Sequence, residues 1–130
     1  MNIPILLASV MTVVTLIAHV VGGTAEFMHP VWQSNAPEFN KVGMSVIWHW
    51  VSAVLFINAI ALFLEARSSS LSRPAVWIIV MQFLAFGLIF AWYGFTVFGS
   101  LFVMPQWIAF AIICALSWGG LRKQNHAEKG

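Results

Sequence analysis

The distribution of charged residues constrains this chain more than any other feature of its sequence. Lys, Arg, Asp and Glu make up 8% of its 130 residues, whereas a soluble domain carries about 25%. Most of these charges lie outside four long apolar stretches, either between them or after the last one. Because so few charges cannot cover a water-facing surface, we expect lipid to be the main solvent of this chain. The apolar stretches therefore predict helices that cross a membrane.

We expect one all-α domain, residues 1–130, in which four transmembrane helices form a bundle. The predicted spans are residues 4–22, 42–66, 75–98 and 101–118. Gly22 and Gly23 are expected to end the first span, and Gly119 and Gly120 the fourth. Residues 23–41 are predicted as an outer connector in the membrane interface, because their aromatic side chains are too apolar for a free loop. Residues 119–130 are predicted as a polar cytoplasmic tail.

The basic residues predict the orientation of this bundle. With four spans, both termini and the turn between the second and third spans lie on one side. The Lys and Arg residues of that side are Arg67, Arg73, Arg122, Lys123 and Lys129, and the other side has Lys41 alone. Because basic residues collect on the cytoplasmic side, we expect cytoplasmic termini and a multi-pass protein of the bacterial inner membrane. The connector would then face the periplasm.

Polar residues gather near the predicted periplasmic ends of all four spans. They are His19, Glu26, His29, His49, Tyr93 and Gln106. Thr15 shares a helix face with His19, and Ser45 and Ser52 share a face with His49, because they are three or four residues apart. Ionisable residues inside membrane spans are rare and point to function by default. This pattern predicts a polar site at the outer mouth of the bundle.

A metal ion is the favoured occupant of that site. His19, Glu26 and His49, with His29 as a further ligand, would supply imidazole and carboxylate groups suited to zinc, copper or iron. The other polar residues would contact the ligand or support these groups: Gln106, Tyr93, Thr15, Ser45 and Ser52. A b-type haem held between His19 and His49 is a weaker alternative.

Two other classes of function stay open. In the first, the chain is an accessory or structural membrane subunit, and its polar residues only join helices through hydrogen bonds of about 0.6 kcal/mol each. In the second, an oligomer conducts protons or a small solute. We find no recognisable nucleophile, which favours binding over catalysis. Six basic residues spread over the chain form no patch for nucleic acid. The expected partners are the lipid bilayer and a second copy or a larger membrane complex.

Three short motifs resemble a pattern in small, uncharacterised bacterial inner-membrane proteins of similar length. They are Gly22-Gly23-x-x-Glu26 followed by Pro30, then Trp48-His49, then Pro105-Gln106-Trp107. The resemblance spans most of the chain and implies four helices, without implying an activity. It also implies that Glu26, His49 and Gln106 belong to one site.

Overall fold

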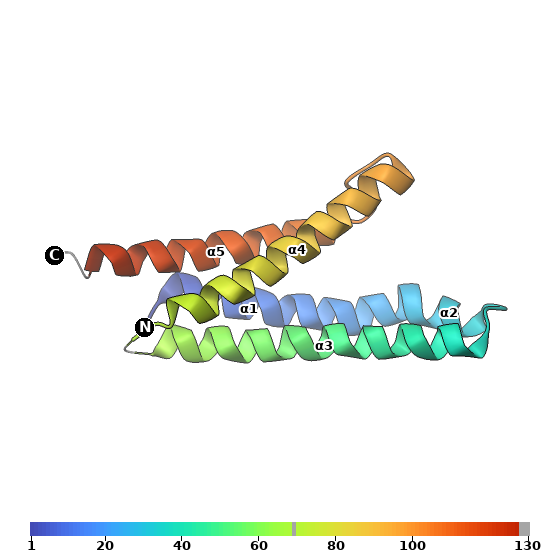
Figure 1. The fold of residues 1–130 in the computed structure, drawn as a ribbon, viewed down its shortest axis with the longest axis horizontal. Helices are drawn as coiled ribbons and strands as arrows, with labels where there is room; N and C mark the ends of the chain where they lie inside the picture. The colour runs from blue at the N-terminus through green and yellow to red at the C-terminus, as the bar shows by residue number, and fades with distance from the viewer. Residues whose placement is uncertain (69, 128–130) are drawn as a thin grey trace.

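The computed structural model describes residues 1–68 and 70–127, with side chains as far as residue 123. The helices, in chain order, are α1 (Ile3–Ala18), η1 (His19–Met28), α2 (His29–Gln33), α3 (Glu38–Arg67), α4 (Arg73–Phe98) and α5 (Gln106–Ala127). They form two antiparallel hairpins, one of α1, η1 and α2 with α3, the other of α4 with α5 (Figure 1). The prediction of an all-helical protein is confirmed.

The first helix continues beyond the glycine pair that was expected to end it. α1, η1 and α2 follow one another without a break from Ile3 to Gln33. The helix therefore does not end at Gly22 as expected, and the first part of the expected connector over residues 23–41 continues it to Gln33. The segment η1 is a π-helix, in which each N–H bonds to the carbonyl five residues earlier. The His29 N–H, for example, donates to the carbonyl of Thr24. Glycine permits a helix end but does not require one.

The first hairpin closes through the short segment of residues 34–37. α3 then runs from Glu38 to Arg67 and contains the predicted second span. Two hydrogen bonds join the tip of this hairpin. The indole Nε1 of Trp32 donates to the Ser45 hydroxyl at 3.2 Å, and Lys41 Nζ donates to the carbonyl oxygen of Trp32 at 3.0 Å.

The second hairpin differs from prediction in its connection. α4 matches the predicted third span and ends at Gly99, whose φ of 67° lies in the left-handed region that favours glycine. α5 begins at Gln106 instead of Leu101. The intervening segment is folded back, and the indole Nε1 of Trp107 donates to the carbonyl of Leu101 at 2.9 Å. α5 also continues to Ala127, so the helix includes most of the residues that were expected to form the polar tail.

Asn2 joins three helices at what we call the closed end of the bundle, where Asn2, Ala66 and Gly120 meet. Its backbone N–H donates to the carbonyl of Ala66 at 2.8 Å, and its side-chain amide donates to the carbonyl of Gly120 at 3.0 Å. Its side-chain oxygen accepts from the N–H of Ile5 at 3.4 Å and caps α1. These contacts explain why α5 does not end at its glycine pair: the pair packs directly on α1.

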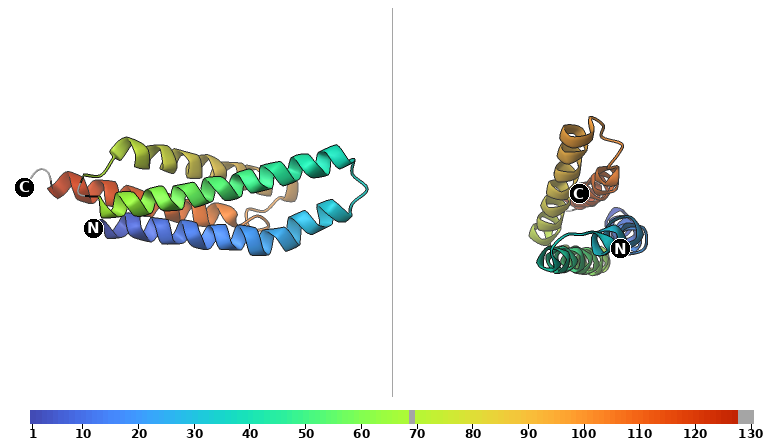
Figure 2. Two further views of the ribbon diagram at one scale, coloured as in Figure 1. Left: turned by 90° about the horizontal axis from the view of Figure 1, so that it is seen from below. Right: turned by 90° about the vertical axis from the view of Figure 1, so that its right-hand side faces the viewer.

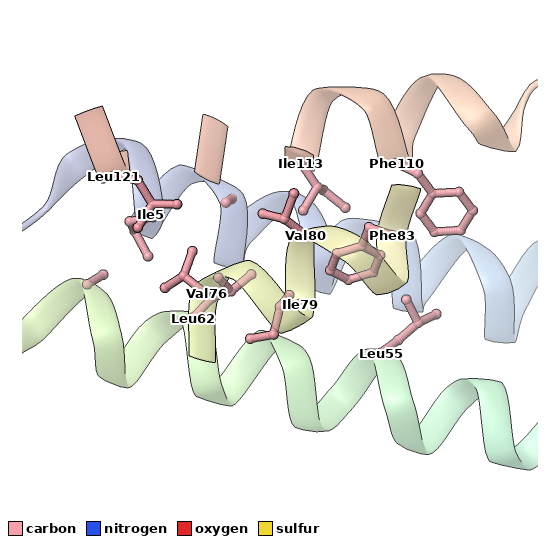
Figure 3. Packing of buried hydrophobic residues seen from close by; sticks show 12 residues of the cluster. Ile5, Leu55, Leu62, Val76, Ile79, Val80, Phe83, Phe110, Ile113 and Leu121 are labelled. Atoms are coloured by element: carbon pink, nitrogen blue, oxygen red, sulfur yellow. The ribbon is translucent and has the colours of Figure 1, made fainter. Parts of the chain in front are cut away.

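The buried core fills the space between the hairpins from the closed end to the middle of the bundle. Its labelled members in Figure 3 are Ile5, Leu55, Leu62, Val76, Ile79, Val80, Phe83, Phe110, Ile113 and Leu121. α1 is the central helix, since it packs against both α3 and α5, whereas α3 and α4 touch little. One polar contact does join α3 to α4: Asn58, 6% exposed, donates to Gln82 at 2.9 Å.

The two hairpins separate at the opposite end, which we call the open end, formed by residues 34–37 and 99–105. Figure 1 shows the last turns of α4 leaning away from α1 and α3, and the right-hand view of Figure 2 shows the same separation. The first hairpin also extends beyond the second at this end (Figure 2). The divergence leaves space between the hairpins that the core does not fill.

Three helices are long and apolar enough to cross a membrane: the continuous helix Ile3–Gln33, α3 and α4. Their outward faces are covered by exposed Val, Ile, Leu, Phe and Trp side chains, as lipid contact requires. α5 is shorter than these three. The fold is that of a small helical membrane protein.

The two adjacent glycines of α5 provide a matched test of the closed end. A Cβ atom on Gly120 would lie 2.6 Å from Ile5 Cδ1 and 2.9 Å from Asn2 Oδ1, whereas one on Gly119 would lie 3.9 Å from Pro4 Cβ. Because Ile5 is fully buried and cannot move aside, we expect Gly120→Ala to lower the free energy of unfolding by about 1–3 kcal/mol. Denaturant unfolding in mild detergent measures this.

The control is Gly119→Ala, which we expect to leave that free energy unchanged or to raise it by up to about 1 kcal/mol, because alanine favours helix. Equal effects of the two substitutions would contradict the close packing of α5 on α1.

Candidate functional site

Trp48 of α3 occupies the centre of the candidate site. Its indole stacks on the imidazole of His19, with ring centroids 3.9 Å apart and planes 21° from parallel. The ring centroid of Phe27 lies 6.3 Å from that of the same indole. A Cβ atom on Gly23 would lie 2.9 Å from Trp48 Cζ2, so only glycine leaves room for the indole there. The contact of η1 with α3 therefore depends on this pairing of Gly23 and Trp48.

A cleft of about 600 Å³ lies between the hairpins on one side of Trp48. We call it the interhelical cleft. Residues of α1, η1, α3, α4, α5 and the α4–α5 connection line it, and most of them are apolar. Aromatic rings stand on both hairpins: Phe27 and Trp48 on the first, and Phe90 and Phe110, 5.9 Å apart, on the second. The cleft results directly from the separation of the hairpins towards the open end.

Four polar side chains line the interhelical cleft: Thr15, His19, Glu26 and Gln106. The Thr15 hydroxyl donates to the carbonyl of Met11 at 2.8 Å, so its oxygen is left as an acceptor. His19 Nε2 lies 3.3 Å from the carbonyl oxygen of Trp48. Since a carbonyl only accepts, Nε2 carries the proton in this contact, and Nδ1 of a neutral ring is an acceptor.

The other two polar groups also present oxygen acceptors. Glu26 is exposed, on η1. Gln106 lies at the first position of α5, and its Oε1 is buried with no hydrogen-bond partner among the residues described. Buried amide oxygens are normally paired, so Gln106 Oε1 is a polar group that helix packing leaves unused among the described residues.

A second, smaller hollow of about 350 Å³ lies on the other side of Trp48, and we call it the hairpin hollow. Its polar lining residues are Thr24, His29, Ser45, His49 and Ser52. The Ser45 hydroxyl donates to the carbonyl of Lys41 at 3.0 Å, and the Ser52 hydroxyl donates to the carbonyl of Trp48 at 3.0 Å. These serines are engaged with their own helix, as hydroxyl residues in membrane helices commonly are.

Trp48 thus divides the predicted polar site in two. Thr15, His19, Glu26 and Gln106 line the interhelical cleft, whereas His29, Ser45, His49 and Ser52 line the hairpin hollow. His49 is exposed and does not line the cleft with His19, although the sequence pattern predicted one site for both. Consecutive helix residues point about 100° apart, so when Trp48 packs on η1, His49 is turned away. Tyr93 is 55% exposed and lines neither hollow.

The predicted metal ligands are consequently not gathered. Within the described part of the chain, no group of three or more His, Cys, Asp or Glu side chains is placed to hold a metal ion. His19 and His49 line different hollows, so the structure does not bring them together as the facing pair that a haem iron needs.

Sequence reasoning found the polar side of the cleft but not its walls. It missed Phe90, Met104 and Phe110, which line the cleft from the second hairpin. Apolar residues in a membrane helix look alike in sequence whether they face lipid or a cavity, so no periodic signal identifies them. The glycine pair and the Trp-His pair were the available clues to the contact between Gly23 and Trp48.

No protein-family model, curated protein or solved structure matches this chain. The resemblance to small bacterial inner-membrane proteins therefore stays a prediction. Of its three motifs, the structure brings Gly23, Glu26, Trp48 and Gln106 to one cleft and places His49 in the other hollow.

The packing of Trp48 on η1 can be tested with the neighbouring glycines. We expect Gly23→Ala to displace the indole and to lower the free energy of unfolding by about 1–3 kcal/mol, as overpacking does. The near-ultraviolet circular dichroism of the aromatic rings should change as well. Gly22→Ala is the control, because a Cβ atom there meets nothing within 4 Å. If both variants kept the wild-type spectrum and stability, the contact would be absent.

Proposed function

We propose that this chain is a four-span protein of the bacterial inner membrane that binds a small lipophilic molecule in the interhelical cleft. Three helices already meet the length and hydropathy of a membrane span. α5 lies antiparallel to α4 and packs along α1. Its uncharged part, from Gln106 to Leu121, has 16 residues and corresponds to about 24 Å at 1.5 Å per residue, against a hydrocarbon thickness of about 30 Å. These features support α5 as the fourth span.

The distribution of basic residues supports a cytoplasmic closed end. Arg67 ends α3 and Arg73 begins α4, while Arg122 and Lys123 lie in the last turns of α5. All four belong to the end at which Asn2 is held, and Lys41 belongs to the open end. Positive residues favour the cytoplasmic side. The interhelical cleft would then lie towards the periplasm.

The cleft itself is the observation that carries the binding function. Its volume of about 600 Å³ falls within the range of about 300–1,000 Å³ that small-molecule sites occupy. Such sites are mainly apolar with a few polar groups that orient the ligand, and this cleft has aromatic walls with Thr15, His19, Glu26 and Gln106 among them. The binding of a lipophilic molecule fits this lining better than the binding of a metal ion.

The four-span topology can be tested with alkaline phosphatase fusions in a bacterial host, since this enzyme is active only outside the cytoplasm. We expect an active fusion after Ser100, at the open end, and an inactive fusion after Ala127, at the closed end. Cell-surface phosphatase activity, normalised to fusion protein, is the measurement. Activity at both positions would show that α5 does not cross the membrane.

Ligand binding can be tested by filling the cleft. Ala109 is half-buried and lines the cleft, whereas Ala111, on the same helix, is exposed. We expect the purified protein to bind the neutral lipophilic dye Nile red saturably, as measured by fluorescence titration in mild detergent. Ala109→Trp should weaken binding at least about tenfold because the indole takes the ligand's space, a loss of about 1.4 kcal/mol.

Ala111→Trp is the control and should bind the dye as the wild type does. Equal dye binding by all three proteins would place the dye outside the cleft and overturn the proposed function. If the wild type bound no dye and Ala109→Trp instead split a dimer into monomers, as seen by light scattering, the cleft would be an interface between copies. The structural-subunit alternative would then hold.

A further inference from the structure

The charge of the interhelical cleft is carried by one residue. Glu26 is the one Asp, Glu, Lys or Arg among the residues that line it. Lys41, the one Lys or Arg at the open end of the described chain, donates to the carbonyl of Trp32 at the hairpin tip. The other described basic residues belong to the closed end. The cleft is therefore a net acidic environment with apolar walls.

The uncharged polar groups of the cleft also favour a positively charged or hydrogen-bond-donating ligand. Thr15 and His19 each present an acceptor atom, because their existing hydrogen bonds use their donors. The Thr15 hydroxyl and His19 Nε2 already donate to backbone carbonyls. The other side-chain donors of the lining residues are the amide of Gln106 and the indole N–H of Trp48, and neither is charged. A molecule that offers positive charge or hydrogen-bond donors would be complementary to this set.

The aromatic rings of the cleft favour positive charge as well. Phe27 and Trp48 stand together near Glu26 on the first hairpin, and Phe90 and Phe110 stand together on the second. The face of an aromatic ring attracts a cation, most strongly for Trp, and the attraction rises when the cation is shielded from water. Two aromatic pairs with one carboxylate form a site for a cation that has an apolar body.

We propose that the molecule bound in the interhelical cleft is a lipophilic cation, with its charge near Glu26 and the ring of Trp48 and its apolar body against the wall that Phe90 and Phe110 form. This inference rests on the proposed function, since it names the chemical class of the ligand of the same cleft. The carboxylate supplies the selectivity for charge, and the apolar walls supply most of the affinity.

Two probes of nearly the same shape and opposite charge test this directly: tetraphenylphosphonium, a cation, and tetraphenylborate, an anion. Equilibrium binding of each to the full chain is measured in uncharged detergent, and the signal of protein-free micelles of the same detergent corrects for partitioning. We expect the wild type to bind the cation at least about tenfold more tightly than the anion, because an opposite charge near a carboxylate is favoured in a medium of low polarity.

Glu26→Gln keeps the size of the side chain and removes its charge. We expect it to weaken binding of the cation about tenfold, with no loss for the anion. Glu38→Gln is the matched control, since Glu38 lies at the start of α3, outside the cleft lining, and should change neither affinity. A cation preference that is present in the wild type and in Glu38→Gln but lost in Glu26→Gln establishes the inference.

The other outcomes separate the two proposals. Equal binding of both probes, blocked by Ala109→Trp and unaffected by Glu26→Gln, would overturn the cation class and leave the proposed function standing. Tighter binding of the anion would also overturn the cation class. Binding of both probes that Ala109→Trp does not change would overturn the proposed function itself, because the cleft would not be the place of binding.

Discussion

The junction of three helices at Asn2 is the contact on which the rest of the structure depends. Asn2 bonds α1 to the ends of α3 and α5, and Gly120 lets α5 lie directly on Ile5. Water is absent from a membrane interior, so helices are held together by close packing and hydrogen bonds and not by burial alone. The hairpins are thus tightly joined at one end, and the space between them opens towards the other.

That geometry gives the polar residues of this chain different roles. Ser9 donates to the carbonyl of Ala59 at 2.8 Å, and Asn58 donates to Gln82, so these groups join helices within the packed half. In the separated half, Glu26 and Gln106 line a cleft and have no such structural use among the described contacts. Polar groups that helix packing does not use are the ones available to a ligand.

The π-helical segment η1 connects the packing to the candidate site. It carries Gly23 and Glu26 along with Phe27, and it lets the helix continue through a glycine pair while the indole of Trp48 fills the space that Gly23 leaves. Interruptions of this kind in membrane helices are frequent at functional positions. Here the interruption places a carboxylate, an imidazole and two aromatic rings around one cleft.

The sequence by itself determined the helical membrane architecture, because long stretches without charge have few other structures open to them. It also determined that α3 and α4 would span residues 38–67 and 73–98 to within a few residues, and that Thr15 and His19 would share a face. The tertiary structure alone decided whether a helix ends at a glycine pair. The helices continue through Gly23 and Gly120, because each glycine packs against a residue distant in sequence, Trp48 and Ile5 respectively. It also decided which polar residues meet. Trp48 of α3 packs on η1 and separates His49 from His19. Helical periodicity cannot reveal this contact, because it depends on how η1 and α3 face each other within the first hairpin.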